Sequence, residues 1–157
     1  MTRAGIGYDL HRLAEGRKLI LGGIELAYPK GPVGHSDGDA LSHALCDALL
    51  GAAGLGDIGT HFPDTDPKWK DASSLRFLEH IRDLLAKHNF RIVHLDAIVI
   101  AERPKLGPHL PAMREALSKS LNIAPSMINL KAKTNESVDA IGRGEAIAAQ
   151  AIATLDR

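Results

Sequence analysis

The sequence predicts a domain that combines β-strands with α-helices. Three stretches indicate this class. Residues 4–11 alternate between two faces as a strand does, residues 39–52 repeat apolar side chains with helical period, and residues 90–101 form a long β-branched run. A chain of 157 residues is long enough to bury one hydrophobic core. We therefore expect a single domain over residues 1–157.

The composition argues against several functional classes. The 19 basic and 19 acidic residues balance, and aromatic residues make up only 4% of the chain. Neither value favours a nucleic-acid partner, which calls for basic or stacking surfaces. No apolar run reaches the roughly 18 residues of a membrane span. The single cysteine, Cys46, excludes an internal disulfide and suits a reducing compartment, and the first residues lack a signal-peptide pattern. We expect a cytoplasmic protein with no membrane partner.

The first strand carries the start of a candidate metal site. Alternate residues of a strand face opposite sides, so Asp9 and His11 point the same way. The other residues on their face are Gly5 and Gly7, which we expect to leave room for a ligand near the backbone. The opposite face holds Ala4, Ile6, Tyr8 and Leu10.

A hairpin and a loop lead to the first helix. Residues 18–26 predict a hairpin that turns at Gly22 and Gly23. Residues 27–36 predict a loop, after which Ser36 or Asp37 is a candidate N-cap. The helix that follows ends near Gly54–Gly56. Its apolar stripe contains Leu41, Ala44, Leu45, Ala48, Leu49 and Ala52.

His43 lies off that stripe and completes a set of two imidazoles and one carboxylate. Together with Asp9 and His11 it gives three ligands with a fourth position open, which is typical of catalytic zinc. Such a site polarises a bound oxygen. Asp39 and Asp47 lie four residues on either side of His43, and either one could orient its second ring nitrogen. The alternative is that Asp-x-His belongs to an ordinary strand and His43 to an ordinary helix.

The middle of the chain alternates polar segments with regular elements. Residues 57–67 are either a solvated loop or a mobile flap over a substrate. Ser73 or Ser74 can cap a helix over residues 74–88. In the strand at residues 90–101, His94 and Asp96 form either a polar face or a buried pair.

Four more segments complete the chain. A tight turn at residues 102–108 follows a strand end, where ligands often bind. A helix over residues 109–121 and a strand over residues 128–133 come next. The last stretch, residues 145–155, is ambiguous, because its alanines favour a helix while the preceding Gly142-Arg143-Gly144 is a break.

These motifs closely resemble those of the 2-C-methyl-D-erythritol 2,4-cyclodiphosphate synthases of the non-mevalonate isoprenoid pathway. The matching segments are GIGYDLHRL at 5–13, GHSDGDALSHALCDALLGAAGLGDIGTHFPDTDP at 34–67, AERPKL at 101–106, and the KT-x-E and GRGE pieces within 133–145. They extend over most of the chain. Because no second domain is present, we expect the stand-alone form rather than a fusion to the preceding cytidylyltransferase.

The resemblance implies an intramolecular phosphoryl transfer. The substrate would be 4-diphosphocytidyl-2-C-methyl-D-erythritol 2-phosphate, whose own 2-phosphate attacks the β-phosphorus and expels CMP. No enzyme nucleophile is needed, and we find no convincing Ser-His-Asp or Cys-His arrangement. Phosphoryl transfer depends mainly on positioning and charge neutralisation.

The resemblance also implies roles for individual residues. Asp9, His11 and His43 would hold Zn²⁺, and Glu136 a second divalent cation, Mg²⁺ or Mn²⁺. His35 and Thr134 would stabilise the transition state. Contacts to the methylerythritol part would come from Ser36, Asp57, Ile58, Gly59, Phe62, Pro63, Asp64, Thr65 and Asp66. The cytidine diphosphate pocket would comprise Ala101, Glu102, Arg103, Pro104, Lys105, Leu106, Gly107 and Lys133. Further substrate contacts would be Asp9, Leu10, His11, His35, Thr134, Asn135, Glu136, Ala140 and Arg143.

The implied fold is α+β, with a mixed four-stranded sheet and helices on one face. The implied assembly is a homotrimer with inward-facing sheets and an active site between each pair of subunits. The resemblance favours a strand at residues 145–155, with Ile147, Ala149, Ala151, Ala153 and Leu155 on one face.

One segment departs from the family pattern. After Glu136 the family has a lysine, a glycine and an aromatic residue, where this chain has Ser137–Ile141. The aromatic residue lines a central trimer cavity that can hold an isoprenoid diphosphate above the arginines, of which Arg143 is kept. Its replacement by Ala140 argues against such binding here.

Two other functions fit the same residues. A zinc phosphohydrolase would use metal-bound hydroxide and release an open-chain product. A metal-stabilised nucleotide-binding module would perform no chemistry. Loss of turnover in a His35→Ala variant that keeps zinc and CMP would favour the cyclase.

Overall fold

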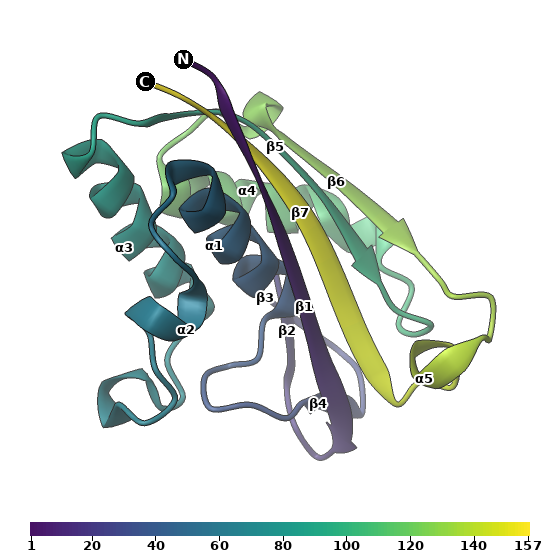
Figure 1. The fold of residues 1–157 in the computed structure, drawn as a ribbon. Coiled ribbons are helices and arrows are strands. Elements are labelled where there is room, and N and C mark those ends of the chain that lie inside the picture. Colours follow the sequence, from purple (N-terminus) through teal and green to yellow (C-terminus); the bar gives the residue numbers. More distant parts are fainter.

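The structure, a computed structural model describing all residues 1–157, is built on one mixed sheet with the strand order β4-β1-β7-β5-β6 (Figure 1). β5 and β6 run parallel, and the other neighbouring strands run antiparallel. Helices pack on the sheet, so the predicted α+β class is confirmed. The strands are β1 (Arg3–Glu15), β4 (Lys30–Pro32), β5 (Arg91–Ile100), β6 (Ile128–Lys133) and β7 (Ala146–Asp156).

The predicted number of four strands is wrong, because a fifth strand, β4, lies within the segment expected to be a loop. It pairs with the end of β1, from Leu13 opposite Pro32 to Glu15 opposite Lys30. A three-residue edge strand that contains glycine and proline gives no alternating pattern to detect. The predicted hairpin is confirmed as a separate two-stranded sheet of β2 (Leu19–Leu21) and β3 (Ile24–Leu26).

The ambiguous last stretch is strand β7, as the family resemblance implied. It pairs with β1 along one edge and with β5 along the other. Its side chains alternate as predicted, with Ile147, Ala149, Ala151, Ala153 and Leu155 all buried. Pairing on both edges and burial of these small side chains outweigh the helix propensity of alanine.

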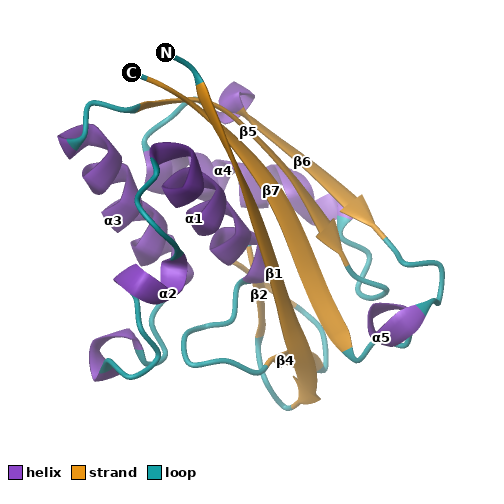
Figure 2. Cartoon of the chain, in the orientation of Figure 1, coloured by secondary structure: helices purple, strands orange, loops and turns teal.

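Three long helices cover one face of the sheet (Figure 2). They are α1 (Ala40–Ala53), α3 (Ser74–Lys87) and α4 (Leu110–Leu121). The short helices α2 (Ile58–His61) and α5 (Asp139–Gly142) lie in connections. Single 3₁₀ turns are formed by η1 (Pro67–Trp69), η2 (Gly107–His109) and η3 (Pro125–Met127).

The glycines of β1 serve helix packing rather than ligand access. A Cβ atom on Gly7 would lie 1.9 Å from the backbone oxygen of Ala44, and one on Gly5 would lie 2.2 Å from that of Ala48. Only glycine lets α1 approach the strand this closely. That close approach brings His43, on α1, next to Asp9 and His11.

The N-cap of α1 is Asp39, and not Ser36 or Asp37 as predicted. Its buried carboxylate accepts hydrogen bonds from the Ser42 amide at 3.0 Å and from the Gly22 and Gly23 amides at 2.9 and 2.8 Å. Burial raises the pKa of Asp39 despite these bonds. Two of these three amides belong to the hairpin, which is far from Asp39 along the chain. Local residue spacing therefore did not identify Asp39 as the N-cap.

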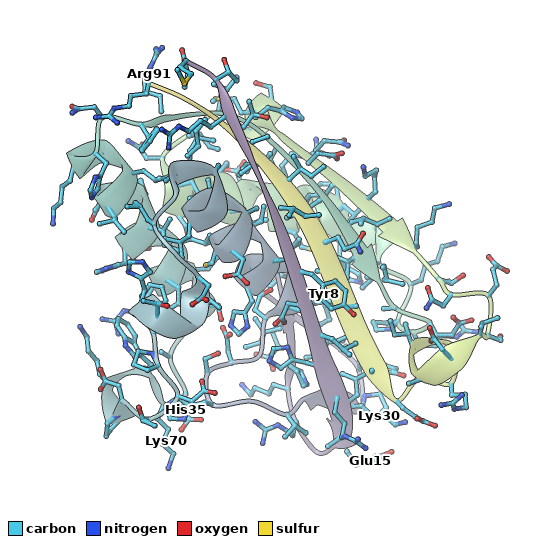
Figure 3. All side chains as sticks on the ribbon, in the orientation of Figure 1. Tyr8, Glu15, Lys30, His35, Lys70 and Arg91 are labelled. Atoms are coloured by element: carbon cyan, nitrogen blue, oxygen red, sulfur yellow. The ribbon has the colours of Figure 1, made fainter.

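The other face of the sheet exposes large apolar side chains. Ile6 is 74% exposed, Tyr8 53%, Leu10 52% and Ile152 49%. Figure 3 shows the side chain of Tyr8 on β1. Asp96 also lies on this face, where it accepts a hydrogen bond from the Lys131 ammonium at 2.7 Å. Of the two alternatives predicted for this strand, a polar face or a buried pair, the structure has the polar face. No helix of the structure has both the length and the apolar character for crossing a bilayer.

Candidate metal centre and two cavities

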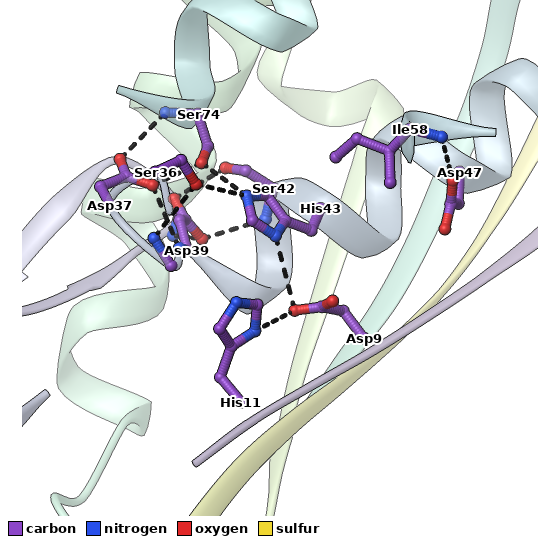
Figure 4. A network of polar contacts seen from close by, with 12 residues as sticks. Asp9, His11, Ser36, Asp37, Asp39, Ser42, His43, Asp47, Ile58 and Ser74 are labelled. Atoms are coloured by element: carbon purple, nitrogen blue, oxygen red, sulfur yellow. Dashed lines mark hydrogen bonds and ion pairs between the residues drawn. The ribbon is translucent and has the colours of Figure 1, made fainter. Parts of the chain in front are cut away.

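Asp9, His11 and His43 converge at the interface between β1 and α1 (Figure 4). Asp9 Oδ2 lies 2.6 Å from His11 Nδ1 and 3.6 Å from His43 Nδ1. One potential ligand atom from each residue lies within 4.8 Å of the other two. The structure thus brings together the three side chains that the strand and helix patterns selected.

The chemistry of this triad fits a metal ion. Asp9 Oδ2 and His11 Nδ1 are buried, and neither has a hydrogen-bond partner of acceptable geometry despite their short separation. Burial tends to raise the pKa of Asp9, but polar contacts with His11 and His43 outweigh it and hold that pKa below the ordinary value. Burial likewise tends to lower the pKa of His43, and Asp9 reverses the effect. Two imidazole nitrogens and a carboxylate oxygen form a ligand set that is typical of zinc sites.

The second ring nitrogen of His43 does not face the predicted Asp39 or Asp47. Its Nε2 lies 2.8 Å from Ser74 Oγ and 3.2 Å from Ser36 Oγ. Asp47 instead accepts a hydrogen bond from the Ile58 amide at 2.7 Å. The spacing of four residues places Asp39 and Asp47 on the same side of the helix as His43. The ring, however, turns toward the start of α3, which sequence spacing does not describe.

The triad opens into a cavity of about 620 Å³, called here the triad cavity. The predicted site residues that line it are Asp9, Leu10, His11, His35, Ser36, His43, Ile58, Gly59, Phe62, Pro63, Asp64 and Thr65. The segment 57–67, expected to be a loop or flap, folds into α2 and the start of η1. His35 Nε2 lies 3.2 Å from the backbone oxygen of Asp66, which ties this segment to the loop before α1.

Sequence reasoning missed five residues of this cavity: Arg12, Val33, Gly34, Trp69 and Phe77. The two aromatic ones pack with Phe62, whose ring centroid lies 4.4 Å from that of Phe77 and 4.9 Å from that of Trp69. The chain has only three Phe, one Trp and two Tyr residues. The clustering of scarce aromatic residues within 62–77 was a usable signal for a cavity wall.

A second cavity of about 480 Å³, called here the turn cavity, lies beside the turn after β5. Its lining comprises Ala101, Glu102, Arg103, Pro104, Lys105, Leu106, Gly107, Ala132, Lys133 and Thr134. Only Ala132 was not among the predicted residues. The parallel pairing of β5 with β6 brings the two strand ends together, and Ala101 and Lys133 share a backbone hydrogen bond of 3.0 Å.

The remaining predicted residues line neither cavity. Asp57 is exposed and caps α2 by accepting from the Thr60 amide and hydroxyl. Asp66 contributes its backbone oxygen to His35. Glu136 accepts a hydrogen bond from Thr134 Oγ1 at 3.2 Å. Asn135, Ala140 and Arg143 lie in the segment around α5, where Arg143 pairs with Glu145 at 2.8 Å.

The segment that departs from the family pattern has a tight local structure. Asp139 accepts hydrogen bonds from the amides of Ile141 at 2.8 Å and Gly142 at 3.2 Å, and from the side chain of Asn135 at 2.8 Å. Glu136, Ser137 and Asp139 have left-handed backbones, with φ of 52°, 62° and 63°. Asp139 therefore holds the turn that carries Ala140.

Sequence and structure comparisons identify relatives over nearly the whole chain. A sequence model of the YgbB family matches residues 2–156. The 2-C-methyl-D-erythritol 2,4-cyclodiphosphate synthase of Clostridium perfringens is 55% identical over 153 residues, which is 98% of each chain. That of Symbiobacterium thermophilum is 54% identical over 151 residues, 96% of each chain.

A solved structure supports the same relationship. A 2C-methyl-D-erythritol-2,4-cyclodiphosphate synthase in a CDP-bound form superposes with a TM-score of 0.90 at 43% identity, over 98% of this chain and 100% of the other. The chain therefore belongs to the YgbB family, that of the 2-C-methyl-D-erythritol 2,4-cyclodiphosphate synthases.

Proposed function

We propose that this enzyme converts 4-diphosphocytidyl-2-C-methyl-D-erythritol 2-phosphate to the 2,4-cyclodiphosphate and CMP by metal-dependent, intramolecular phosphoryl transfer. An oxygen of the 2-phosphate forms a bond to the β-phosphorus. The bond from that phosphorus to the oxygen bridging to CMP breaks, and CMP leaves with the electron pair. The observation that supports this proposal most strongly is that most of the predicted site residues line two separate cavities. One cavity contains the triad, which could hold a metal ion, and the other contains two lysines.

Asp9, His11 and His43 are the residues that would hold Zn²⁺, and Glu136 would hold Mg²⁺ or Mn²⁺. Bound there, the cations would supply charge neutralisation and polarisation at the diphosphate. The triad supports the first assignment by its convergence and by two buried ligand atoms that lack a well-aligned hydrogen bond. The contact between Glu136 and Thr134 at the rim of the turn cavity supports the second.

The protein's own side chains position the reacting groups. His35 lines the triad cavity, and its Nε2–H donates to the Asp66 carbonyl. The other ring nitrogen, when protonated, would donate to phosphoryl oxygens that gain charge in the transition state. Ser36 and Gly59 line the same cavity and suit the methylerythritol part. Lys105 and Lys133 would neutralise the cytidine diphosphate in the turn cavity. The CDP-bound form of the solved relative supports a diphosphate ligand for this fold.

We infer a homotrimer in which the triad cavity of one subunit faces the turn cavity of its neighbour. His35 and Thr134, the two proposed transition-state groups, line different cavities of the chain. The apolar sheet face around Ile6, Tyr8 and Ile152 supports burial against other copies. Such an arrangement would complete the site by joining one cavity from each of two chains.

Phosphorus NMR of the purified enzyme with substrate, Zn²⁺ and Mg²⁺ tests the reaction. We expect CMP and a cyclic diphosphate as the products. CMP with an open-chain diphosphate would instead establish a hydrolase. Full zinc occupancy and CMP binding without turnover would establish a binding module.

A further inference from the structure

A chain of polar contacts lies behind His43, and the function proposed above gives its members Asp37 and Ser74 no role. The ring of His43 lies between two sets of partners, with Nδ1 toward Asp9 and Nε2 toward Ser74 (Figure 4). Ser74 is fully buried at the start of α3, and its hydroxyl donates to Asp37 Oδ1. The contacts thus run from Asp37 through Ser74 to the imidazole.

The direction of these hydrogen bonds follows from Asp37. Its Oδ2 accepts from the Ser74 amide at 2.9 Å, and its Oδ1 accepts from the Asp39 amide at 3.1 Å. Both oxygens act as acceptors, as in an ionised carboxylate. The Ser74 hydroxyl proton is therefore directed at Asp37, and the oxygen of that hydroxyl is left to accept.

The atom of the His43 ring that faces this oxygen is Nε2, at 2.8 Å. To bond an oxygen that can only accept, Nε2 must carry the proton. A neutral imidazole has one protonated nitrogen, so a proton on Nε2 leaves the lone pair on Nδ1. Nδ1 faces Asp9 Oδ2 at 3.6 Å, beyond hydrogen-bond distance, so in the neutral ring the shorter contact with Ser74 fixes the proton and leaves the Nδ1 lone pair for a metal ion. Ser36 Oγ also faces Nε2, at 3.2 Å, but it has no carboxylate to fix its own proton and accepts only a long bond of 3.4 Å from the Gly38 amide.

The contacts from Asp37 through Ser74 to His43 are called here the relay. Backbone hydrogen bonds hold the relay in place. The Asp37 amide donates to the Ala72 carbonyl at 3.1 Å, and the Asp71 amide donates to the His35 carbonyl at 2.9 Å. The loop before α1 is thereby joined to the loop before α3. Phe77, one turn into α3, stacks beside the His43 ring at a centroid distance of 6.0 Å and an interplanar angle of 24°.

We propose that Asp37 and Ser74 are positioning residues that fix the Nε2–H tautomer and the ring orientation of His43, and thereby set the affinity of the triad for zinc. This inference rests on the proposed zinc site. Outer partners of metal-bound imidazoles typically contribute about 10- to 100-fold in metal affinity. Asp39 and Asp47, although correctly spaced, accept hydrogen bonds from the Ser42 and Ile58 amides instead, which leaves Nε2 of His43 to Ser74.

Competition of the apo enzyme with a chromophoric chelator for Zn²⁺ gives the first test. Ser74→Ala removes the acceptor, and we expect zinc to bind about 10- to 100-fold more weakly than in the wild type. Asp37→Asn, which allows the serine hydroxyl to reverse, should weaken binding less. Ser42→Ala is the matched control, because Ser42 is also buried and its hydroxyl bonds a carboxylate, that of Asp39, at 2.7 Å without contacting His43. The control should keep wild-type zinc affinity.

Nitrogen-15 NMR of the apo wild type at alkaline pH, where the His43 ring is neutral, gives the second test and needs no variant to fold. We expect the proton on Nε2, and in a folded Ser74→Ala variant a mixture of tautomers. A proton on Nδ1 in the wild type, or unchanged zinc affinity in folded Ser74→Ala, would overturn the relay. Failure of the wild type itself to bind zinc would instead overturn the metal site.

Discussion

The triad cavity and the turn cavity are built in different ways. The triad cavity is set by buried contacts, in which α1 packs on the glycines of β1 and His43 is fixed from behind by Ser74. The turn cavity is a backbone turn at two strand ends that carries exposed cations such as Lys105. Substitutions at the triad and at the packed residues behind it should therefore change metal binding and folding, whereas substitution of an exposed cation of the turn cavity should change substrate binding and leave both unchanged.

The largest effect is expected at the metal ligands. His43→Ala removes one of three ligands, and we expect zinc content and kcat/KM to fall together, the latter about 1,000-fold, since a Lewis acid contributes several kcal/mol. Metal analysis and steady-state kinetics measure both. The exposed His88→Ala is the control and should change neither. Normal zinc occupancy in His43→Ala would remove His43 from the ligands.

The same glycine substitution should have different outcomes at the packed interface behind the triad and in the turn cavity. Gly7→Ala would place a Cβ atom against the backbone of α1, and we expect it to lower the free energy of unfolding by about 3 kcal/mol. Gly107→Ala meets no atom within 4 Å, and we expect a change within about 0.5 kcal/mol. Denaturant unfolding measures both. Equal effects would contradict the contrast between the packed interface of β1 with α1 and the open turn at Gly107.

A smaller effect is expected at His35. Because it lies at the triad cavity without being a metal ligand, His35→Ala should lower kcat about 100-fold, as loss of a transition-state donor does, while zinc content stays at the wild-type level. Single-turnover kinetics with metal analysis provides the test. Full turnover in this variant would show that another group stabilises the transition state.

The smallest effect is expected at Lys105. Loss of one charge-assisted contact should raise KM about tenfold with little change in kcat, and the difference from the wild type should shrink at high salt. Lys87→Ala, an exposed lysine at the end of α3, is the control. A fall in kcat with unchanged KM would move Lys105 from substrate binding to the chemical step.

The sequence predicted those features that depend on short-range periodicity. Alternation placed Asp9 with His11, and helical spacing set His43 apart from the apolar stripe. The features it missed depend on contacts between distant segments. Asp39 caps α1 partly through the hairpin amides, and Ser74 reaches His43 from another helix. The role of Gly7 was misjudged because its close neighbour, Ala44, lies 37 positions away along the chain.

The proposed trimer site, shared between subunits, is tested most directly by mixing inactive variants. His43→Ala lacks a working triad cavity, and a Lys105→Ala/Thr134→Ala double variant lacks a working turn cavity. After subunit exchange in an equal mixture, about one site in four would combine two intact cavities. We predict activity well above that of either variant alone. Activity that stays at the level of the parents, although mass spectrometry shows mixed oligomers, would contradict a site built from two chains.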